Sequence, residues 1–403
     1  MENINRTQLF RAACLSLLVT SLSFGIRAGI LNKLGTDFQL DKAQLGSITA
    51  TAFWGFPLAV VFGGIVVDLI GMKRLLVLAF VFHLAGILLT VFAQGYWTLF
   101  LSTLLIGLAN GTVEAACNPL VTALYPDNKT TKLNHFHLWF PGGIVIGTLI
   151  VLLLNKINIG WQVQVGVMLI PTLIYGYLFS RLNFPVTERV ASGVSTAGMY
   201  KALWNPLFIF MFICMFGTAI TELFTGQWID VLLKNVTDNA ILILTLDTGV
   251  MVIGRGFAKP VLKLVPPEVL LLISTILAAT GIYMLSTVTG PAIYAAAIIF
   301  GMGVCYFWPT MLGFVNTNIP KTGALGLNLM GGAGMFAVSL YLIIMGKHYD
   351  TIVKEANGDS SFAGQKILQT TLVIPLVLIV AFGGLVLYMR SKNKTQPIAN
   401  PAV

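Results

Sequence analysis

The stretch GGIVVDLIGMKRL, residues 63–75, joins two long apolar runs through a short charged segment. The run before it covers about residues 45–69 and the run after it about residues 75–93. Each run is close to the roughly 20 apolar residues that a helix needs to cross the hydrocarbon core of a bilayer. The charges between them, Asp68, Lys73 and Arg74, therefore mark a loop at a membrane surface.

The composition extends this interpretation to the whole chain. Of its 403 residues 57% are apolar and 10% charged, and the mean hydropathy is +0.87. A soluble domain carries about 25% charged residues, so a water-soluble fold is excluded. The net charge of +9 follows the loops rather than a compact basic domain, so we expect no nucleic-acid partner. The chain is predicted to be an all-α, polytopic membrane protein in contact with the lipid bilayer.

Hydropathy predicts twelve transmembrane helices. The longest polar stretch, residues 184–201, falls after the sixth span and divides the chain into two pseudo-symmetric bundles of six helices. We therefore expect an N-terminal bundle at 1–183, a cytoplasmic loop at 184–204, a second bundle at 205–390 and a cytoplasmic tail at 391–403. The predicted spans are 9–31, 45–69, 75–93, 97–123, 134–155, 161–180, 205–229, 240–264, 269–286, 291–315, 324–345 and 367–389.

The distribution of Lys and Arg predicts the orientation. Fifteen of these residues lie in loops on the side of the termini and seven on the other side. Cytoplasmic loops carry the excess of positive charge, so both termini are predicted to be cytoplasmic. Short loops without added domains favour the inner membrane of a bacterium, and we expect a monomer.

The opening stretch resembles the signature of the major facilitator superfamily, G-x-x-x-D-R-x-G-R-K/R, at the end of the second helix. Leu69 and Met72 stand where the family has basic residues. In physical terms, an acid that ends one helix can pair with bases that open the next and keep the cytoplasmic side closed, while the glycines permit a tight turn. A plain positively charged loop is the alternative. The residues that carry the resemblance are Gly64, Asp68, Gly71, Lys73 and Arg74.

A carboxylate stands within the apolar stretch GLANGTVEAACNPLVTALYPDN, residues 107–128. Asn110, Glu114 and Asn118 are four residues apart, so they form one stripe on a helix. Amides beside a carboxylate suit a ligand rich in hydroxyl groups. Burial penalises the charged form, so Glu114 is a candidate to take up a proton on one side and release it on the other. A structural role and direct substrate binding remain the alternatives.

The same stretch resembles the fucose–galactose–glucose proton symporter family, which has E-x-x-x-N-P here, matched by Glu114, Asn118 and Pro119. The segment TELFTGQWID resembles the seventh helix of that family through Glu222 and Trp228. This resemblance implies a sugar substrate and proton coupling.

The first helix departs from that family. Gly29 stands where the family has an acidic residue, and Arg27 is nearby. The segment SFGIRAGI resembles instead the first helix of anion–cation symporters, in which an Arg holds an anionic group. The resemblances therefore imply two different substrate classes.

The other charges inside the spans mark a pathway, because each costs about 2.5–3.5 kcal/mol to insert. Arg27 and Glu222 match in depth, and we predict an Arg27–Glu222 pair that helps to close the extracellular side; an anion-holding or a structural Arg27 is the alternative. Asp247 is a possible second partner for Arg27. Arg255 is expected to pair near the cytoplasmic closure.

Aromatic side chains in the spans offer stacking faces for sugar rings, with ordinary lipid- or helix-facing aromatics as the alternative. They are Phe53, Trp54, Trp139, Phe140, Tyr306, Phe307 and Trp308. The four cysteines fall in apolar runs and are interpreted as packing residues. His135 and His137 are too few ligands for a metal. We therefore predict no metal site and no cofactor.

The sequence predicts a secondary transporter in which two bundles rock around a midplane site and Glu114 couples transport to a proton, with sodium as a less favoured coupling ion. The substrate is expected to be a sugar; a small organic anion held by Arg27 is the alternative. An enzyme is not expected, because the chain contains no nucleophile elbow, H-E-x-x-H or Walker motif.

Overall fold

The molecule is built from membrane-length helices. The structure, a computed structural model, describes residues 4–40, 42–225, 240–357 and 359–395, and in these ranges eleven helical segments are long and apolar enough to cross a membrane. The eighth predicted span is the exception, because it divides at Phe257 into α13 (Ala240–Gly256) and α14 (Ala258–Leu264). With α13 these segments account for the twelve predicted spans, and the predicted all-α membrane fold is confirmed.

The spans of the first half follow the predicted order. Two of them are interrupted, since Leu138 separates α5 from α6 and residues 167–168 separate α7 from α8. The helices are α1 (Arg6–Asp37), α2 (Lys42–Ile70), α3 (Met72–Val91), α4 (Tyr96–Leu124), α5 (Lys129–His137), α6 (Trp139–Lys156), α7 (Trp161–Gly166) and α8 (Leu169–Arg181).

The second half has interruptions as well. The seventh span is α11 (Pro206–Ala219) followed by η2 (Ile220–Phe224), one turn of π-helix. The remaining helices are α15 (Pro267–Thr287), α16 (Ala292–Val304), α17 (Phe307–Asn318), α18 (Gly323–Glu355) and α19 (Ser360–Thr395).

Several ends differ from the predicted ones. Helix α18 runs to Glu355, ten residues past the predicted end at 345, and α19 begins before the predicted 367. Hydropathy finds the part of a helix that the bilayer covers, whereas backbone hydrogen bonding continues beyond it. The predicted loop at 184–204 contains α9 (Glu188–Ala191) and α10 (Thr196–Leu203), and α19 extends five residues into the predicted tail.

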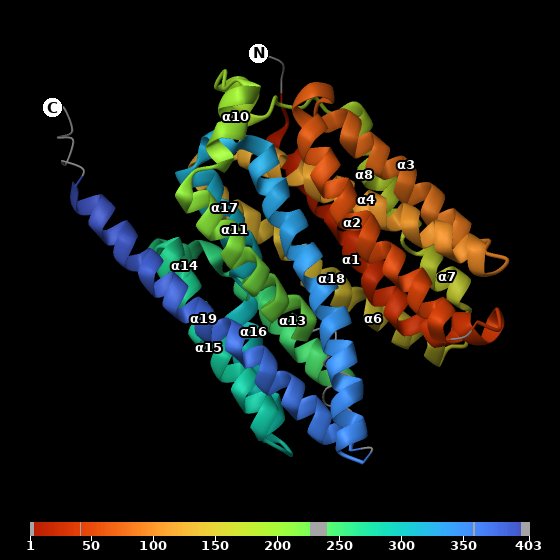
Figure 1. Cartoon of the computed structure of the whole chain (residues 1–403). Coiled ribbons are helices and arrows are strands. Elements are labelled where there is room, and N and C mark those ends of the chain that lie inside the picture. Colours follow the sequence, from red (N-terminus) through yellow and green to blue (C-terminus); the bar gives the residue numbers. More distant parts are fainter. Residues whose placement is uncertain (1–3, 41, 226–239, 358, 396–403) are drawn as a thin grey trace.

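The two halves lie next to each other, with α2 against α18 at the seam (Figure 1). Both chain ends and α10 lie at the same end of the bundle, which we call the terminal side; the opposite end is the distal side (Figure 1). Within the halves, α4 packs on α2 and α3, and α15 packs on α16 and α19. The seam itself is formed by α2 and α4 against α18, α5 against α17, and α6 against α13.

Asp68 helps to hold the terminal side together, but not with the predicted partners. Its carboxylate accepts hydrogen bonds from Arg189 Nε at 2.6 Å and from the hydroxyl of Thr187, both in the segment between the halves. Lys73 donates instead to the carbonyl of Leu182 at 3.1 Å, and Arg74 is exposed. Gly71 makes the turn into α3 with a φ of 86°. The acid that ends α2 is thus paired with the segment between the halves and not with the bases that open α3.

Small residues let the halves approach closely on the terminal side. A Cβ on Gly64 would lie 2.6 Å from the Cβ of Asn328, and a Cβ on Gly313 would lie 2.7 Å from the Cα of Thr130. Asn328 also donates to the carbonyl of Ala115 at 2.9 Å. These contacts hold α2, α4 and α5 of the first half close to α17 and α18 of the second.

Candidate functional site

Glu114 lies at the seam between the two halves and receives hydrogen bonds from both of them. Its Oε1 accepts from Asn118 Nδ2 at 3.1 Å, one turn along α4, and from Trp308 Nε1 at 3.2 Å, which belongs to α17 of the second half. His137 Nε2 lies 3.7 Å from the same oxygen and hydrogen-bonds Asn118 Oδ1 at 3.0 Å. The side chain is 3% exposed. One buried carboxylate therefore connects two bundles.

Arg255 forms a second connection across the seam. Its guanidinium donates to Glu222 Oε1 at 2.8 Å, to the carbonyl of Cys305 at 2.6 Å and to the carbonyl of His137 at 2.8 Å. Only the His137 carbonyl belongs to the first half. The residue is 1% exposed. Since every branch of this guanidinium has an oxygen partner, Arg255 is fully committed to holding the cluster.

These residues surround a small cavity of about 30 Å³, which is room for a water molecule or two. We call the residues around it the central cluster. Its members come from α2, α4, α5, α6, η2, α13, α17 and α18, so four elements of each half meet here. The lining residues are Phe56, Glu114, His137, Phe140, Glu222, Leu223, Arg255, Trp308 and Met335.

A larger cavity of about 290 Å³ lies on the distal side of the central cluster. This volume is near the lower end of the range for small-molecule sites. Three phenyl rings contribute to its walls, with the ring centroids of Phe53 and Phe140 each 5.9 Å from that of Phe24. The other lining residues are Gly25, Arg27, Ala28, Leu31, Thr49, Pro141, Ile144, Thr148, Glu222, Leu223, Asp247, Thr248 and Met251.

The predicted Arg27–Glu222 pair is not formed in this structure. Glu222 Oε1 is bonded to Arg255, whereas Arg27 makes no hydrogen bond or ion pair within the part of the chain that the structure describes. The π-helical turn η2 changes the direction in which Glu222 projects, because its wider turn breaks the 100° step between successive residues. The predicted place of Arg255 is also wrong. Arg255 lies in the central cluster and not near the cytoplasmic closure.

The predicted stripe on α4 is divided. Asn110 points away from Glu114 and donates to Ser23 Oγ at 3.2 Å, while its Oδ1 lies 2.8 Å from His83 Nε2. His83 in turn lies 2.8 Å from the hydroxyl of Tyr175. Asn110 therefore stabilises the interior of the first half and does not line either cavity at the seam.

Asp247 and Trp308, two further predicted residues, lie on the cavity walls. Asp247 lines the larger cavity together with Glu222. Trp308 belongs to the central cluster, where its indole contacts Glu114. Trp228 lies outside the described residues. Of the other predicted aromatic faces, Trp54 points outward with 44% exposure and Phe307 is buried in the core.

His137 lies in the central cluster, a place that its sequence pattern did not predict. The pair of histidines was interpreted only as a deficient metal site, and among the described residues no group of His, Cys, Asp or Glu could hold a metal ion. Its signal in the sequence was a polar side chain shortly before the Pro141-Gly142-Gly143 stretch, one helix after a carboxylate within an apolar span. That pattern alone does not reveal which helix face meets Glu114.

Comparison with known proteins supports the fold. The family model of the Major Facilitator Superfamily matches residues 13–345 of this chain. A facilitated glucose transporter (solute carrier family 2, member 10) of Xenopus laevis is 26% identical over 172 residues, 42% of this chain and 31% of that protein. A D-xylose transporter of Levilactobacillus brevis is 23% identical over 172 residues, 42% and 38% of the two chains. The matched stretches thus span about a third of these relatives.

Solved structures resemble the chain over nearly its whole length. The outward conformation of FucP, the fucose:proton symporter of E. coli, superposes with a TM-score of 0.74 at 16% identity, over 93% of this chain and 98% of that one. The proton:xylose symporter XylE gives 0.71 at 14% identity, over 93% and 96%. The human organic anion transporter MFSD10 gives 0.71 at 11% identity, over 94% and 100%. These identities bear on the fold alone.

Proposed function

Because the chain belongs to the major facilitator superfamily, whose members are transporters and not enzymes, we propose that it moves a sugar across the membrane together with a proton. Transport follows alternating access, in which the two six-helix bundles rock around a midplane site. The bundles are residues 1–183 and 205–390, joined by the segment 184–204 and followed by the tail 391–403.

The observation that carries the proposal is the place of Glu114. It is a buried carboxyl at the seam, with Asn118 and His137 from its own bundle and Trp308 from the other. A buried ionisable group in a membrane protein is costly unless it faces a partner or a pathway. A carboxyl in contact with both moving parts is well placed to couple its proton to their motion.

The coupling step follows from hydrogen-bond chemistry. A carboxylate accepts stronger hydrogen bonds than a neutral carboxyl, so charged Glu114 favours the contact with Trp308 that joins the bundles. A proton on Glu114 weakens that contact. Binding and release of the proton on opposite sides of the membrane then bias which side of the seam opens.

Sugar recognition is supported by the larger cavity. The phenyl rings of Phe24, Phe53 and Phe140 offer apolar faces, and Thr49 and Thr148 contribute hydroxyl groups. The relatives are named as transporters of glucose, myo-inositol and xylose, which are all polyhydroxylated solutes. This combination of apolar faces and polar groups suits the two faces of a sugar ring.

The second candidate function is transport of a small organic anion. Arg27 favours it, because this residue lines the larger cavity and has no anionic partner among the described residues. The resemblance to an organic anion transporter agrees with it only at the level of the fold.

The remaining proposals concern topology. The excess of Lys and Arg on the terminal side supports two cytoplasmic termini, and the short loops without added domains favour the inner membrane of a bacterium. The close contacts on the terminal side and the cavity toward the distal side then support a protein closed to the cytoplasm. We expect uptake by a monomer, with a proton rather than sodium as the coupling ion.

Solute-driven proton uptake in proteoliposomes tests the proposal. A sugar panel and an organic-acid panel are compared for the wild type, Glu114→Gln and the control Glu355→Gln, which removes an exposed carboxylate at the end of α18. We expect a sugar-dependent proton flux that Glu114→Gln abolishes while counterflow exchange persists, with the control unchanged. Transport that is intact in both variants without proton movement, or that follows a sodium gradient, contradicts the coupling role.

A further inference from the structure

The larger cavity carries two carboxyl oxygens without hydrogen-bond donors. Asp247 on α13 is 2% exposed, and its Oδ1 has no hydrogen-bond partner among the described residues. Glu222 binds Arg255 through Oε1, while its buried Oε2 likewise has no partner in the part of the chain that the structure describes. Both side chains line this cavity. A buried acceptor without a donor is unfavourable, so both oxygens are ready to accept from a ligand.

The hydroxyl groups on the walls of this cavity also present acceptors. Thr49 Oγ1 and Thr148 Oγ1 each donate to a backbone carbonyl in the preceding turn of their own helix, at 2.9 Å. Thr248 Oγ1 donates in the same way at 3.3 Å. Since a hydroxyl group has one hydrogen, these bonds leave its lone pairs for a ligand.

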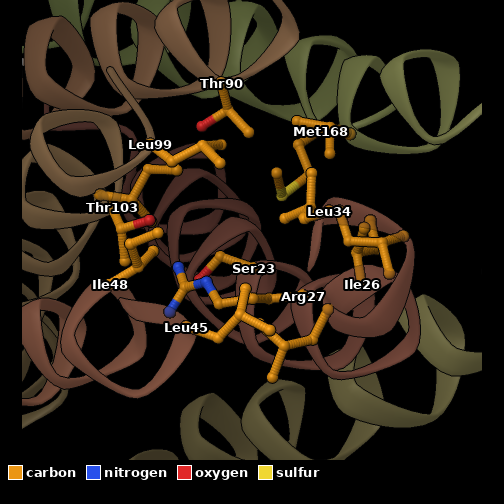
Figure 2. Close-up of a pocket in the computed structure, with 14 residues that line it drawn as sticks. Ser23, Ile26, Arg27, Leu34, Leu45, Ile48, Thr90, Leu99, Thr103 and Met168 are labelled. Carbon is orange, nitrogen blue, oxygen red and sulfur yellow. The ribbon is translucent and has the colours of Figure 1, made fainter. Parts of the chain in front are cut away.

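Arg27 does not change this pattern. Of the described residues that line the larger cavity it is the basic one, but it also lines a smaller cavity, of about 30 Å³, within the N-terminal bundle. Figure 2 shows its guanidinium beside Ser23, among the side chains that line the smaller cavity. The polar groups that the described residues present to the larger cavity are therefore acceptors, which favours a ligand rich in donors.

The charges around the larger cavity favour a cation. Arg255 compensates Glu222 at 2.8 Å and donates its other hydrogen bonds to backbone carbonyls. The ion pairs among the described residues do not include Asp247. A buried carboxylate without a counterion is costly, and a ligand with one positive charge removes that cost. The three phenyl rings on the walls add to this preference, because the face of an aromatic ring attracts a cation.

We propose that the substrate is an amino sugar whose ammonium group binds the carboxylate of Asp247. Its hydroxyl groups donate to Glu222 Oε2 in the same bundle and to Thr49 and Thr148 across the seam. An ammonium group brings three donors and no acceptor, which is the complement of this wall. A neutral sugar leaves Asp247 without a counterion, and an organic anion brings a like charge toward it. This inference rests on the proposed function, since it takes a sugar transporter as given and names the class of sugar.

The test measures binding to the purified full-length protein by calorimetry, in an amine-free buffer at a pH of about 6, where the amine of the ligand is protonated. The ligands share one skeleton: glucose, glucosamine, N-acetylglucosamine and glucuronate, with the galactose series as a second set. Cyclohexylamine is the ammonium ligand without hydroxyl groups. The wild type alone then shows whether an ammonium group is preferred.

Two variants assign the preference to a residue. Asp247→Asn removes the carboxylate, and Asp127→Asn makes the same change at an exposed position as the control. Size-exclusion profiles identify a variant that fails to fold, and Asp247→Ser, which has a smaller side chain, then serves in place of Asp247→Asn.

We expect one of the amino sugars to bind at least about tenfold more tightly than its neutral parent and its N-acetyl derivative, as a charge-assisted hydrogen bond permits. Asp247→Asn should remove this preference by lowering the affinity for the amino sugar much more than that for the neutral sugar. Cyclohexylamine should bind more weakly than the amino sugar, and Asp127→Asn should behave as wild type.

Binding of the neutral sugar, its N-acetyl derivative or the uronic acid that is as tight as that of the amino sugar overturns the inference. A preference that survives in Asp247→Asn does the same, as does cyclohexylamine binding that equals that of the amino sugar.

The proton-uptake assay, with amino sugars added to the sugar panel, separates the two proposals. If neutral sugars drive Glu114-dependent proton uptake while amino sugars bind no more tightly than they do, only the amino-sugar inference fails. If the amino sugar binds with the expected preference but no member of either panel is transported, the proposed function fails and the binding site stands.

Discussion

At the scale of the residue, the guanidinium of Arg255 makes three hydrogen bonds at the seam. It bonds the carboxylate of Glu222 and two backbone carbonyls, and one of these, at His137, belongs to the other bundle. Removal of one member of a buried ion pair leaves the other charge without compensation, which is more costly than the loss of both. The same residue therefore contributes to stability and to the connection between bundles.

We predict that Arg255→Met lowers the free energy of unfolding by about 3–5 kcal/mol, because Glu222 remains buried without its cation. The double variant Arg255→Met/Glu222→Met should recover a large part of this loss. Denaturant titration of the purified protein in detergent micelles measures both values.

The exposed pair Lys33–Asp37, with a nitrogen–oxygen distance of 3.6 Å, provides the control. Lys33→Met should cost no more than about 1 kcal/mol, since solvent screens that pair. A double variant at Arg255 and Glu222 that is less stable than either single variant would refute the assignment of the loss to an uncompensated charge.

At the scale of the element, interruptions in the helices aim the side chains of the site. The break at Leu138 ends α5 so that the carbonyl of His137 can accept from Arg255. The break at residues 305–306 frees the carbonyl of Cys305 for the same guanidinium. The π-helical turn at 220–224 turns Glu222 toward it as well. Pro141 and Pro309 stand four residues after these two carbonyls and have no N–H to donate to them, so both carbonyls are left for Arg255.

The close approach of α17 to α5 gives an element-scale prediction. Gly313→Ala places a Cβ within 2.7 Å of the Cα of Thr130, which only a separation of the two helices can relieve. We expect spin labels at positions 127 and 321, on the terminal side of the two bundles, to report longer distances in this variant. Net transport should decrease because the terminal side no longer closes.

Gly384→Ala is the matched control, because a Cβ at that position in α19 meets no atom within 4 Å. Its distance distribution and transport should equal those of the wild type. Unchanged distances in Gly313→Ala would show that the seam adapts locally and would remove Gly313 from the closure.

At the scale of the whole molecule, the contacts between bundles are distributed unevenly. The terminal side has the Asp68–Arg189 ion pair and the close contacts of Gly64 and Gly313, while the larger cavity lies toward the distal side. Such asymmetry is what alternating access requires of one end state. Both the direction of opening and the orientation in the membrane can then be tested on the intact chain.

We predict that a fluorescent protein that matures only in the cytoplasm is bright when it is fused to the C-terminus. A fusion in the segment between α3 and α4, at Gln94, should be dark, because the excess of Lys and Arg retains the terminal side in the cytoplasm. Fluorescence normalised to protein amount in membranes measures this. The reverse pattern would invert the assignment of cytoplasmic and external sides.

The sequence alone determined the class of the fold, because a span is a local property: about 20 apolar residues reveal themselves without any knowledge of their neighbours. It also predicted a pathway lined by charged residues, since charge within a span is costly wherever it lies; these residues are Arg27, Glu114, Glu222, Asp247 and Arg255. Which charges meet was decided only by the tertiary structure. Residues four apart on a helix are rotated by about 40°, enough to direct Asn110 to His83 while Glu114 faces the seam. The pairing of Glu222 with Arg255 rather than Arg27 depends in addition on a π-helical turn and on how helices of two bundles cross, and neither is encoded in hydropathy or spacing.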